Sequence, residues 1–419
     1  MESSAPALPV LAYIYHPRSF ATMSLVEAGE GRCRILWVVD TSDPDTASMV
    51  RLLRRFGSVV DIAGLDVDAA AAVIQQHHPD AILTLADDWL VLAARLAQQL
   101  GLEFLSPTIA LRLTDKYEQR RALSSGGLAV PRHWVIEPAA DTNFNEISQQ
   151  ATFPAVLKPR YGQGSRDTLR IDSLEGLIRV WESEGFATSN RTFVLEEYIP
   201  DSELELGGEG FGGYVSVESY VNKGEVGHLA INGRMPPAYP FRETGFFIPA
   251  ALSEDLARSV LDVATQAARA IGVRNGCLHT EIKLTPAGPV VIEVNGRIGG
   301  GVPAMLEATT GVDLMGLAFD LALGRDVRIP KLTPRCVSYL FYVQPPSTMS
   351  HITSVDGLSA LRSHPGVAQV TLNRGAGHDV DWRDGNHGHV FSVFGTCANH
   401  DELRRLAAII PELVDIRGS

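Results

Sequence analysis

Short apolar runs alternate with amphipathic segments along the first quarter of the chain. The apolar runs have the length of buried strands and lie at 11–16, 34–40, 58–64 and 81–86. The segments between them have helical spacing and lie at 43–57, 67–80 and 87–101. Strand followed by helix, repeated in this way, predicts a doubly wound parallel sheet. The first strand is not followed by GxGxxG, so the pattern does not indicate a dinucleotide fingerprint.

Two aspartates follow the fourth run, at a strand end where open α/β sheets place ligands. We nevertheless expect Asp87 to be a helix N-cap and Asp88 a first-turn acid. The next segment, TDKYEQRRALSSGG, predicts a helix capped near Thr114. Its Lys116, a lone lysine on a helix, is expected to be solvated.

The rest of the chain predicts mixed α and β structure. YVSVESYVNKGEVGHLAING (214–233) predicts two strands around Asn222-Lys223-Gly224. The segment 253–272 predicts a helix that Ser253 caps and Gly272 ends. After about residue 330 we expect short strands and a last helix, with a capping box of Asn399 and Glu402.

Composition and charge exclude several classes of protein. Of 419 residues, 45% are apolar and 20% are charged, which is typical of a globular protein with sizeable cores. The net charge of −13 argues against nonspecific nucleic-acid binding, which needs a basic face. No run of 18 apolar residues suggests a membrane span, and no basic segment suggests a signal peptide. Four scattered cysteines without a CxxC pair favour the reducing cytoplasm.

The strongest chemical signal is a predicted hairpin at 276–301, in which CLHTEIKL and VVIEVN are joined by TPAGP. A turn centred on Ala287 pairs Glu281 with Glu293, His279 with Asn295, and Lys283 with Val291. The opposite face, which we expect in the core, carries Ile282, Leu284, Ile292 and Val294. Two carboxylates about 5 Å apart repel each other. A divalent cation removes this repulsion, so Glu281, Glu293 and the amide oxygen of Asn295 are candidate Mg²⁺ ligands. A solvent-facing polar hairpin is the alternative.

Three further features point to phosphate chemistry. Arg297 continues the alternation of the hairpin, and a guanidinium there can stabilise a phosphoryl group or an oxyanion. Lys158 ends a predicted strand before the loop YGQGSR (161–166), whose backbone N–H groups can bind phosphate; a surface hairpin is the alternative. VLEEYIPDSE (194–203) can line an adenosine pocket, with a polar linker as the alternative.

In this order, TDKYEQRRAL, AVLKPRYGQGS, VLEEYIPDSE and TEIKL…IEVNGR resemble the motifs of the ATP-grasp superfamily. GYVSVESYVNKGEV, FRETGFFIPA and HTEIKL closely resemble the L-amino-acid ligases, which join two amino acids into a dipeptide. The resemblance covers most of residues 113–330. It implies an α/β and α+β fold in three parts: an N-terminal pre-ATP-grasp α/β domain (1–112), an ATP-grasp core of two lobes (113–330, smaller lobe about 130–200), and a C-terminal α+β domain (331–419).

The resemblance also implies roles for individual residues. The implied catalytic residues are Arg297 at the reacting centre and Glu243 at the amino-acid substrate. The implied metal ligands, for two Mg²⁺ ions that Mn²⁺ can replace, are Glu281, Glu293 and Asn295. The implied ATP contacts are two lysines, a phosphate-covering loop and an adenosine segment, namely Lys116, Lys158, Gly162, Gly164, Ser165, Glu196, Glu197, Ile199 and Glu203.

Three positions depart from the motifs of this family. Asp201 stands where a glycine is usual. Phe246 stands where the dipeptide ligases often have a histidine, and Gly301 stands where some members have a tryptophan. We expect Gly301 to leave volume open and Phe246 to disfavour a carboxylate, which predicts a bulky or apolar substrate partner.

We therefore expect an ATP-dependent carboxylate–amine ligase. The γ-phosphate of ATP passes to a carboxylate, an amine attacks the acyl phosphate, and ADP and phosphate are released. The expected partners are a small-molecule carboxylate and amine, and a homodimer is left open. A carboxylase-like or purine-type ligase that uses bicarbonate and an inactive nucleotide-binding module are the alternatives.

Other chemical signals are weaker. We expect the histidines of GHDVDWRDGNHGHVF, at 378, 387 and 389, to lie in a polar loop rather than in a metal site. Ser165 and Ser216 lack a nucleophile-elbow motif, and Cys277 is expected to be a small core residue.

Overall fold

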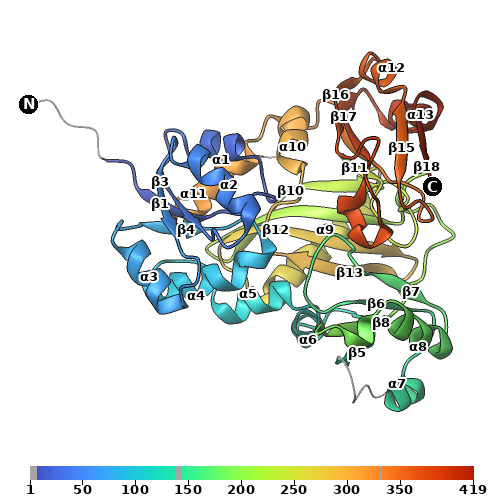
Figure 1. Ribbon diagram of the computed structural model, residues 1–419, viewed down its shortest axis with the longest axis horizontal. Coiled ribbons are helices and arrows are strands. Elements are labelled where there is room, and N and C mark those ends of the chain that lie inside the picture. The colour runs from blue at the N-terminus through green and yellow to red at the C-terminus, as the bar shows by residue number, and fades with distance from the viewer. Residues whose placement is uncertain (1–6, 138–143, 331) are drawn as a thin grey trace, which may run out of the picture.

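The computed structural model describes residues 7–137, 144–330 and 332–419. Figure 1 shows an N-terminal part in blue, a small green lobe, a large sheet between them in yellow tones, and a C-terminal part in orange and red. Within the described residues, no helix is long and apolar enough to cross a membrane.

The N-terminal part is built on a parallel sheet with the strand order β3-β2-β1-β4. Its strands are β1 (Val10–Ile14), β2 (Arg34–Val39), β3 (Ser58–Asp61) and β4 (Ala81–Leu83). The helical elements of this part are α1 (Thr22–Gly29), α2 (Pro44–Leu53), α3 (Val67–Gln75), η1 (Asp87–Trp89), α4 (Leu90–Leu100) and α5 (Pro107–Thr114). All five residues of β1 are buried, as expected for a parallel sheet that helices cover on both faces. The doubly wound sheet is confirmed.

The small lobe is an antiparallel sheet with the order β5-β8-β6-β7. Its strands are β5 (His133–Ile136), β6 (Ala155–Pro159), β7 (Leu169–Ile171) and β8 (Phe193–Glu197). Its helical elements are α7 (Phe144–Gln150), α8 (Leu174–Ser183) and η2 (Phe186–Thr188), and α6 (Lys116–Ser125) leads into it. The cap of α6, predicted near Thr114, is the next residue, Asp115, because Thr114 still belongs to α5.

The largest element is an eight-stranded sheet with the order β13-β12-β9-β10-β11-β14-β17-β16. Its strands are β9 (Tyr214–Asn222), β10 (Glu225–Arg234), β11 (Gly245–Ile248), β12 (Gly276–Thr285), β13 (Gly288–Asn295), β14 (Val337–Val343), β16 (Val367–Leu372) and β17 (Phe391–Cys397). The core and the C-terminal part therefore share one sheet. The division of the chain into three domains stays a prediction.

Helices cover this sheet and join it to the N-terminal part. They are α9 (Glu254–Ile271), α10 (Val302–Thr310) and α11 (Leu314–Ala322). Figure 1 shows α11 beside the blue N-terminal elements, and α11 contacts both α1 and β4. The remaining C-terminal elements are β15 (Ile352–Asp356), α12 (Leu358–Arg362), η3 (Trp382–Gly388), α13 (His400–Leu413) and β18 (Asp415–Gly418).

Several local predictions are confirmed. The turn between β9 and β10 is Lys223-Gly224, and both residues have positive φ, of 53° and 89°. Ser253 caps α9, and Gly272 ends it in the left-handed conformation. Asn399 caps α13 by accepting from the N–H of Glu402, whose side chain accepts from the N–H of Ala398.

Candidate active site

The β12–β13 hairpin brings the predicted metal ligands together. Glu281 lies opposite Glu293, and His279 lies opposite Asn295, as the spacing predicts. The turn is tighter than expected, because Thr285 pairs with Gly288, and a β-bulge after Glu281 restores the register.

The bulge makes two predictions about the hairpin wrong. Lys283 pairs with Val290 rather than with Val291. Val291, fully buried, takes the core position predicted for Ile292, which is only partly buried.

Positive groups surround the two carboxylates of the hairpin. Lys116 Nζ lies 3.0 Å from Glu293 Oε1, and Arg234 and His279 lie near Glu281. Burial alone would raise the pKa of Glu281, but the hydrogen bond from His279 and the charge of Arg234 lower the pKa to about 2. Glu281 is therefore ionised at neutral pH, as an oxygen ligand for a cation must be.

Lys116 is buried, so the expectation that it is solvated is wrong. The first turn of α6 docks between the hairpin and the loop after β6, and Lys116 Nζ donates to the carbonyl of Gly162 at 2.6 Å. Asp115, which caps the helix, also accepts from the Arg160 guanidinium at 2.9 Å. Helix α6 is thereby fixed against the loop that the sequence predicts to cover phosphate.

Lys158 and Glu196 form a buried ion pair in the small lobe, with 2.8 Å between Nζ and Oε2. Arg120 of α6 binds the same carboxylate through two nitrogens, at 2.9 and 3.0 Å. Burial would raise the pKa of Glu196, but Arg120 and Lys158 lower the pKa to about 2. Burial lowers the pKa of the Lys158 ammonium, although Glu196 opposes this shift. Glu196 thus holds Lys158 in place, and its predicted contact with adenine stays a prediction.

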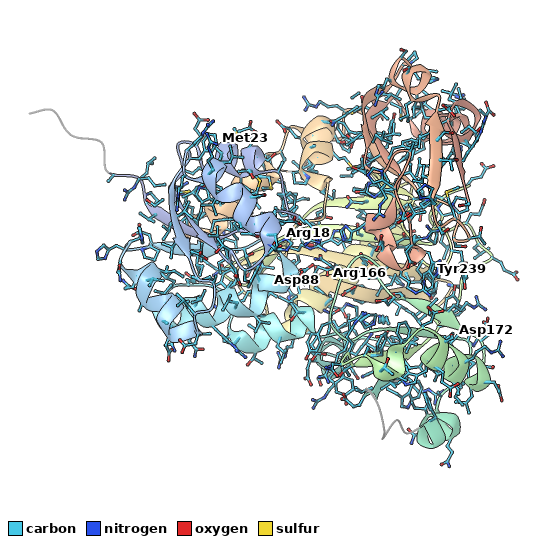
Figure 2. All side chains as sticks on the ribbon, in the orientation of Figure 1. Arg18, Met23, Asp88, Arg166, Asp172 and Tyr239 are labelled. Atoms are coloured by element: carbon cyan, nitrogen blue, oxygen red, sulfur yellow. The ribbon has the colours of Figure 1, made fainter. Side chains whose placement is uncertain are left out.

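The loop after β6 has a backbone suited to close approach. Gly162, Gly164 and Ser165 have φ of 126°, 69° and 57°, which turns the chain sharply. Figure 2 labels Arg166, the exposed residue that follows, between the N-terminal and C-terminal parts of the molecule.

The predicted adenosine segment leaves the end of β8. Glu197 pairs with Arg132 at 2.6 Å, Ile199 is partly buried, and Glu203 is exposed. Asp201, the departure from the usual glycine, pairs with Lys283 of the hairpin. The segment therefore connects the small lobe to the large sheet.

Arg297 lies beside the hairpin and is held by the N-terminal part. Its Nε donates to Asp87 Oδ2 at 2.7 Å, and its Nη2 lies 3.5 Å from Gln163 Oε1 of the loop. The prediction that Asp87 is a helix cap is wrong: the N-cap of η1 is Ala86, and the Asp87 carboxylate turns toward Arg297. Asp87 is thus a site residue, and its position at a strand end was the signal for this role in the sequence.

Glu243, the predicted substrate residue, contacts Arg234 of β10. The Arg234 guanidinium lies 5.1 Å from the centre of the Phe246 ring, within cation–π range. The volume expected next to Gly301 is not open, because a Cβ there would lie 2.5 Å from Leu340 Cδ2 and 3.5 Å from Phe246 Cζ. Leu340, from β14, fills the space that the sequence suggested was empty.

A buried polar network between β9 and β12 was not among the features predicted from the sequence. Glu218 lies opposite His279 and contacts its Nδ1, and the other Glu218 oxygen accepts from the N–H of Gly299 at 3.2 Å. Asn232 donates to Glu218 at 2.9 Å. The signal was present in VSVESYV, where Ser216 and Glu218 interrupt a buried strand with period 2.

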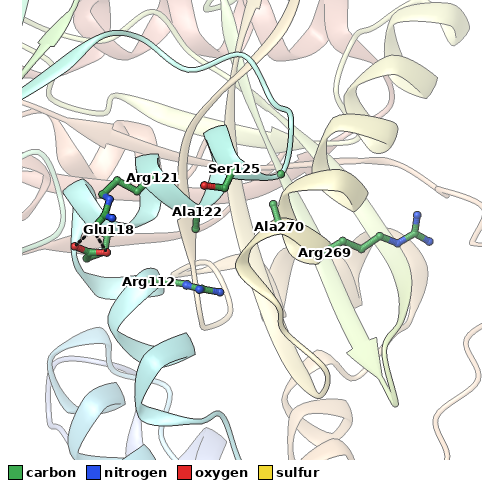
Figure 3. A pocket seen from close by; sticks show the side chains of 8 residues that line it. Arg112, Glu118, Arg121, Ala122, Ser125, Arg269 and Ala270 are labelled. Carbon is green, nitrogen blue, oxygen red and sulfur yellow. Dashed lines mark hydrogen bonds and ion pairs between the residues drawn. The ribbon is translucent and has the colours of Figure 1, made fainter.

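Within the described part of the chain, no group of three or more His, Cys, Asp or Glu side chains is placed to hold a metal ion, so the predicted ligand set rests on two carboxylates and one amide. A surface groove of about 400 Å³ lies between α5, α6 and α9 (Figure 3). Its lining differs from the predicted site residues and consists of Arg112, Glu118, Arg121, Ala122, Ser125, Gly126, Arg269 and Ala270.

Comparison with known proteins agrees with this geometry. The ATP-grasp domain family matches residues 151–304. The chain is 28% identical over 271 residues to carnosine synthase 1 of Gallus gallus, covering 60% of this chain and 28% of that protein. It is 25% identical over 281 residues to alanine–anticapsin ligase of Bacillus subtilis (strain 168), covering 63% of this chain and 58% of that protein. The chain therefore spans less than two thirds of these curated relatives.

A solved structure extends the likeness in fold to the whole chain. The L-amino acid ligase from Bacillus licheniformis superposes with a TM-score of 0.77 at 21% identity, over 99% of this chain and all of that one. Residues 151–304 therefore resemble the ATP-grasp domain family, and the whole chain shares the fold of this L-amino acid ligase.

Proposed function

We propose that this protein is an ATP-dependent carboxylate–amine ligase that forms an amide or peptide bond and releases ADP and phosphate. The carboxylate, an amino acid in this proposal, is activated as an acyl phosphate. The similarity to an alanine–anticapsin ligase and to an L-amino acid ligase supports this class of reaction.

The observation that carries the proposal is the convergence of separate elements on one carboxylate pair. Lys116 from α6 and Arg297 from the turn after β13 flank Glu281 and Glu293, while Lys158 faces them from the small lobe. Cations so placed suit a triphosphate whose charge must be neutralised during phosphoryl transfer. A module that only binds nucleotide needs no such arginine at the reacting centre.

The donor set fits magnesium. Glu281, Glu293 and Asn295 offer oxygen atoms, the ligands that Mg²⁺ prefers. Bound there, Mg²⁺ would screen the repulsion between the substrate carboxylate and the triphosphate. Lys116 balances part of the charge of Glu293, so we expect its ammonium to turn toward phosphate when the cation binds.

The residues of the chain supply the remaining steps. Lys158, held by Glu196, and the backbone of loop 161–166 orient the phosphates. Arg297, held by Asp87, stabilises the charge of the tetrahedral oxyanion that forms when the amine attacks. Glu243 binds the ammonium group of the amino-acid substrate and thereby orients that substrate.

We infer that the side chain of one substrate lies against an apolar cluster beside Gly301. Phe246 and Leu340 form a wall beside Gly301, and Tyr342 adds an aromatic ring to the same side. Apolar surface buried there gains about 25 cal/mol per Å². We infer that at least one partner is apolar.

A pair screen of amino acids tests this function. ADP and phosphate are measured for every pair, and mass spectrometry identifies the product. We expect at least one pair to give equal amounts of ADP and amide. Stoichiometric AMP and pyrophosphate would contradict an acyl phosphate, and ADP release that depends on bicarbonate alone would favour the carboxylase-like alternative.

A further inference from the structure

A short C-terminal segment lies directly against the predicted phosphate loop. The Asn386 N–H of η3 donates to the carbonyl oxygen of Gly164 at 2.8 Å. Gly385 has φ 60° and ψ −134°, and a Cβ there would lie 2.1 Å from the same oxygen. The contact is therefore between two backbones, and only glycine at 385 permits it.

The same segment holds the predicted substrate glutamate. The side-chain Oδ1 of Asn386 accepts from the N–H of Glu243 at 2.7 Å. On the other side, Gln344 Nε2 donates to the Glu243 carbonyl at 2.8 Å. The backbone of Glu243 is thus fixed from both sides, which leaves its carboxylate to Arg234 and to substrate.

We propose that Asn386 is a positioning residue that couples closure of loop 161–166 to the placement of Glu243. Its backbone binds the loop and its side chain binds Glu243, so displacement of the loop removes the support of the substrate residue. Coupling of this kind is reciprocal: an amino acid that binds at Glu243 must tighten nucleotide binding under the loop. This inference rests on the proposed function.

The coupling would also protect the acyl phosphate from hydrolysis. An acyl phosphate is hydrolysed by water unless the site is closed when it forms. With the loop and Glu243 linked through one residue, ATP is cleaved in quantity only when the amino acid is in place.

The test measures binding of adenylyl imidodiphosphate with MgCl₂, with and without a mixture of the twenty proteinogenic L-amino acids. In the wild type we expect the mixture to tighten analogue binding at least about fivefold. Asn386→Ala removes the side-chain acceptor and keeps the N–H that binds the loop. We expect it to bind the analogue alone like the wild type and to lose the enhancement. Asn373→Ala, the same change at an exposed asparagine of the C-terminal part, is the matched control.

A second variant tests the contact between Gly385 and the loop 161–166. Gly385→Ala disturbs the contact with Gly164, and the same loss of enhancement is expected. If Gly385→Ala does not fold, as judged from its melting temperature, the result for Asn386→Ala alone tests the coupling. In the pair screen, Asn386→Ala should release several ADP per amide, whereas the wild type releases one.

The outcomes separate the two proposals. Enhancement by the amino acids that is unchanged in Asn386→Ala, or absent in the wild type, overturns the coupling. If the wild type forms amide and the enhancement is unchanged in Asn386→Ala, only the role of Asn386 is refuted. The proposed function then stands. A wild type that forms no amide with any pair contradicts the proposed function itself.

Discussion

The two ends of one sheet face differ in chemistry. Cross-strand pairs place on this face, in order from β13 to β17, Glu293, Glu281, Ser216, Asn232, Arg234, Phe246, Leu340 and Phe394. The hairpin end carries two carboxylates, and the end at β11 and β14 is apolar. Neighbouring strands lie about 4.8 Å apart, so β12 and β11, three strands apart, are separated by about 14 Å. The carboxylate pair and the apolar side chains therefore occupy opposite ends of one face, and Arg234 lies between them.

The comparison shows which end of this face can be predicted from local sequence patterns. At the hairpin end, polar and apolar residues alternate within two adjacent strands, so the pattern is local. At the apolar end, the wall is assembled from β11 and β14, which are about 90 residues apart in the chain. No local pattern links Gly301 to Leu340.

The largest effect is expected at the hairpin end. Glu293→Gln keeps size and hydrogen bonding but removes one ligand charge and the partner of Lys116. We expect kcat to fall by more than about 100-fold, beyond the 10–100-fold typical of losing an outer partner of a metal site. The melting temperature without ATP should stay near that of the wild type, since removing one of two facing carboxylates relieves repulsion.

Steady-state kinetics over a range of MgCl₂ measures this effect. Glu225→Gln, at an exposed glutamate of the same sheet, should behave like the wild type. More than half of wild-type activity in Glu293→Gln at saturating Mg²⁺ would refute the metal assignment.

An intermediate effect is expected where the N-terminal part supports the hairpin end. Asp87→Asn removes the charge that orients Arg297, and we expect kcat to fall about 10–100-fold, as for other partners of a reacting group. The KM for ATP should stay within about twofold, because Lys116 and Lys158 are untouched. Asp88→Asn, an equal change of charge at the exposed neighbour, should have a smaller effect. Equal losses in the two variants would show that net charge, not orientation, is responsible.

The smallest effect is expected at the apolar end. Leu340→Ala opens volume beside Gly301, and we expect about a 10-fold shift in the ratio of kcat/KM values toward a larger substrate side chain. ADP release with two competing amino acids measures the ratio. Leu372→Ala, at a leucine that is 44% exposed, is the control. Unchanged selectivity in Leu340→Ala would remove Leu340 from the pocket wall.

This pocket also rules out a simpler test. Gly301 has φ 76°, and a side chain there meets Leu340, so Gly301→Trp would strain the backbone as well as fill space. The wall is better tested at Leu340.

Periodicity and capping residues predicted much of the fold. The parallel sheet, the β9–β10 hairpin and the pairing of Glu281 with Glu293 follow from alternation over short distances. The errors in the hairpin have one local physical cause: a single bulge shifted the positions of Lys283 and Ile292 by one residue relative to the facing strand.

The site contacts that sequence analysis could not predict are long-range. Asp87 and Arg297 are 210 residues apart, and Asn386 and Glu243 are 143 apart. An aspartate that follows a strand can cap a helix or form a salt bridge. Which of the two it does depends on whether the fold places a guanidinium group next to it. The roles of the individual site residues stay predictions that the variants above test.

The sheet shared across residue 331 has a consequence for folding. Strand β11 pairs on one side with β10 and on the other with β14 of the C-terminal part, so removing the last 89 residues would turn β11 into a free edge. Phe246 and Phe247 would then lie on an unpaired strand, which is a template for aggregation. The core and the C-terminal part should therefore unfold in one cooperative transition. During synthesis, β11 would need protection from aggregation until β14 has left the ribosome and can pair with it.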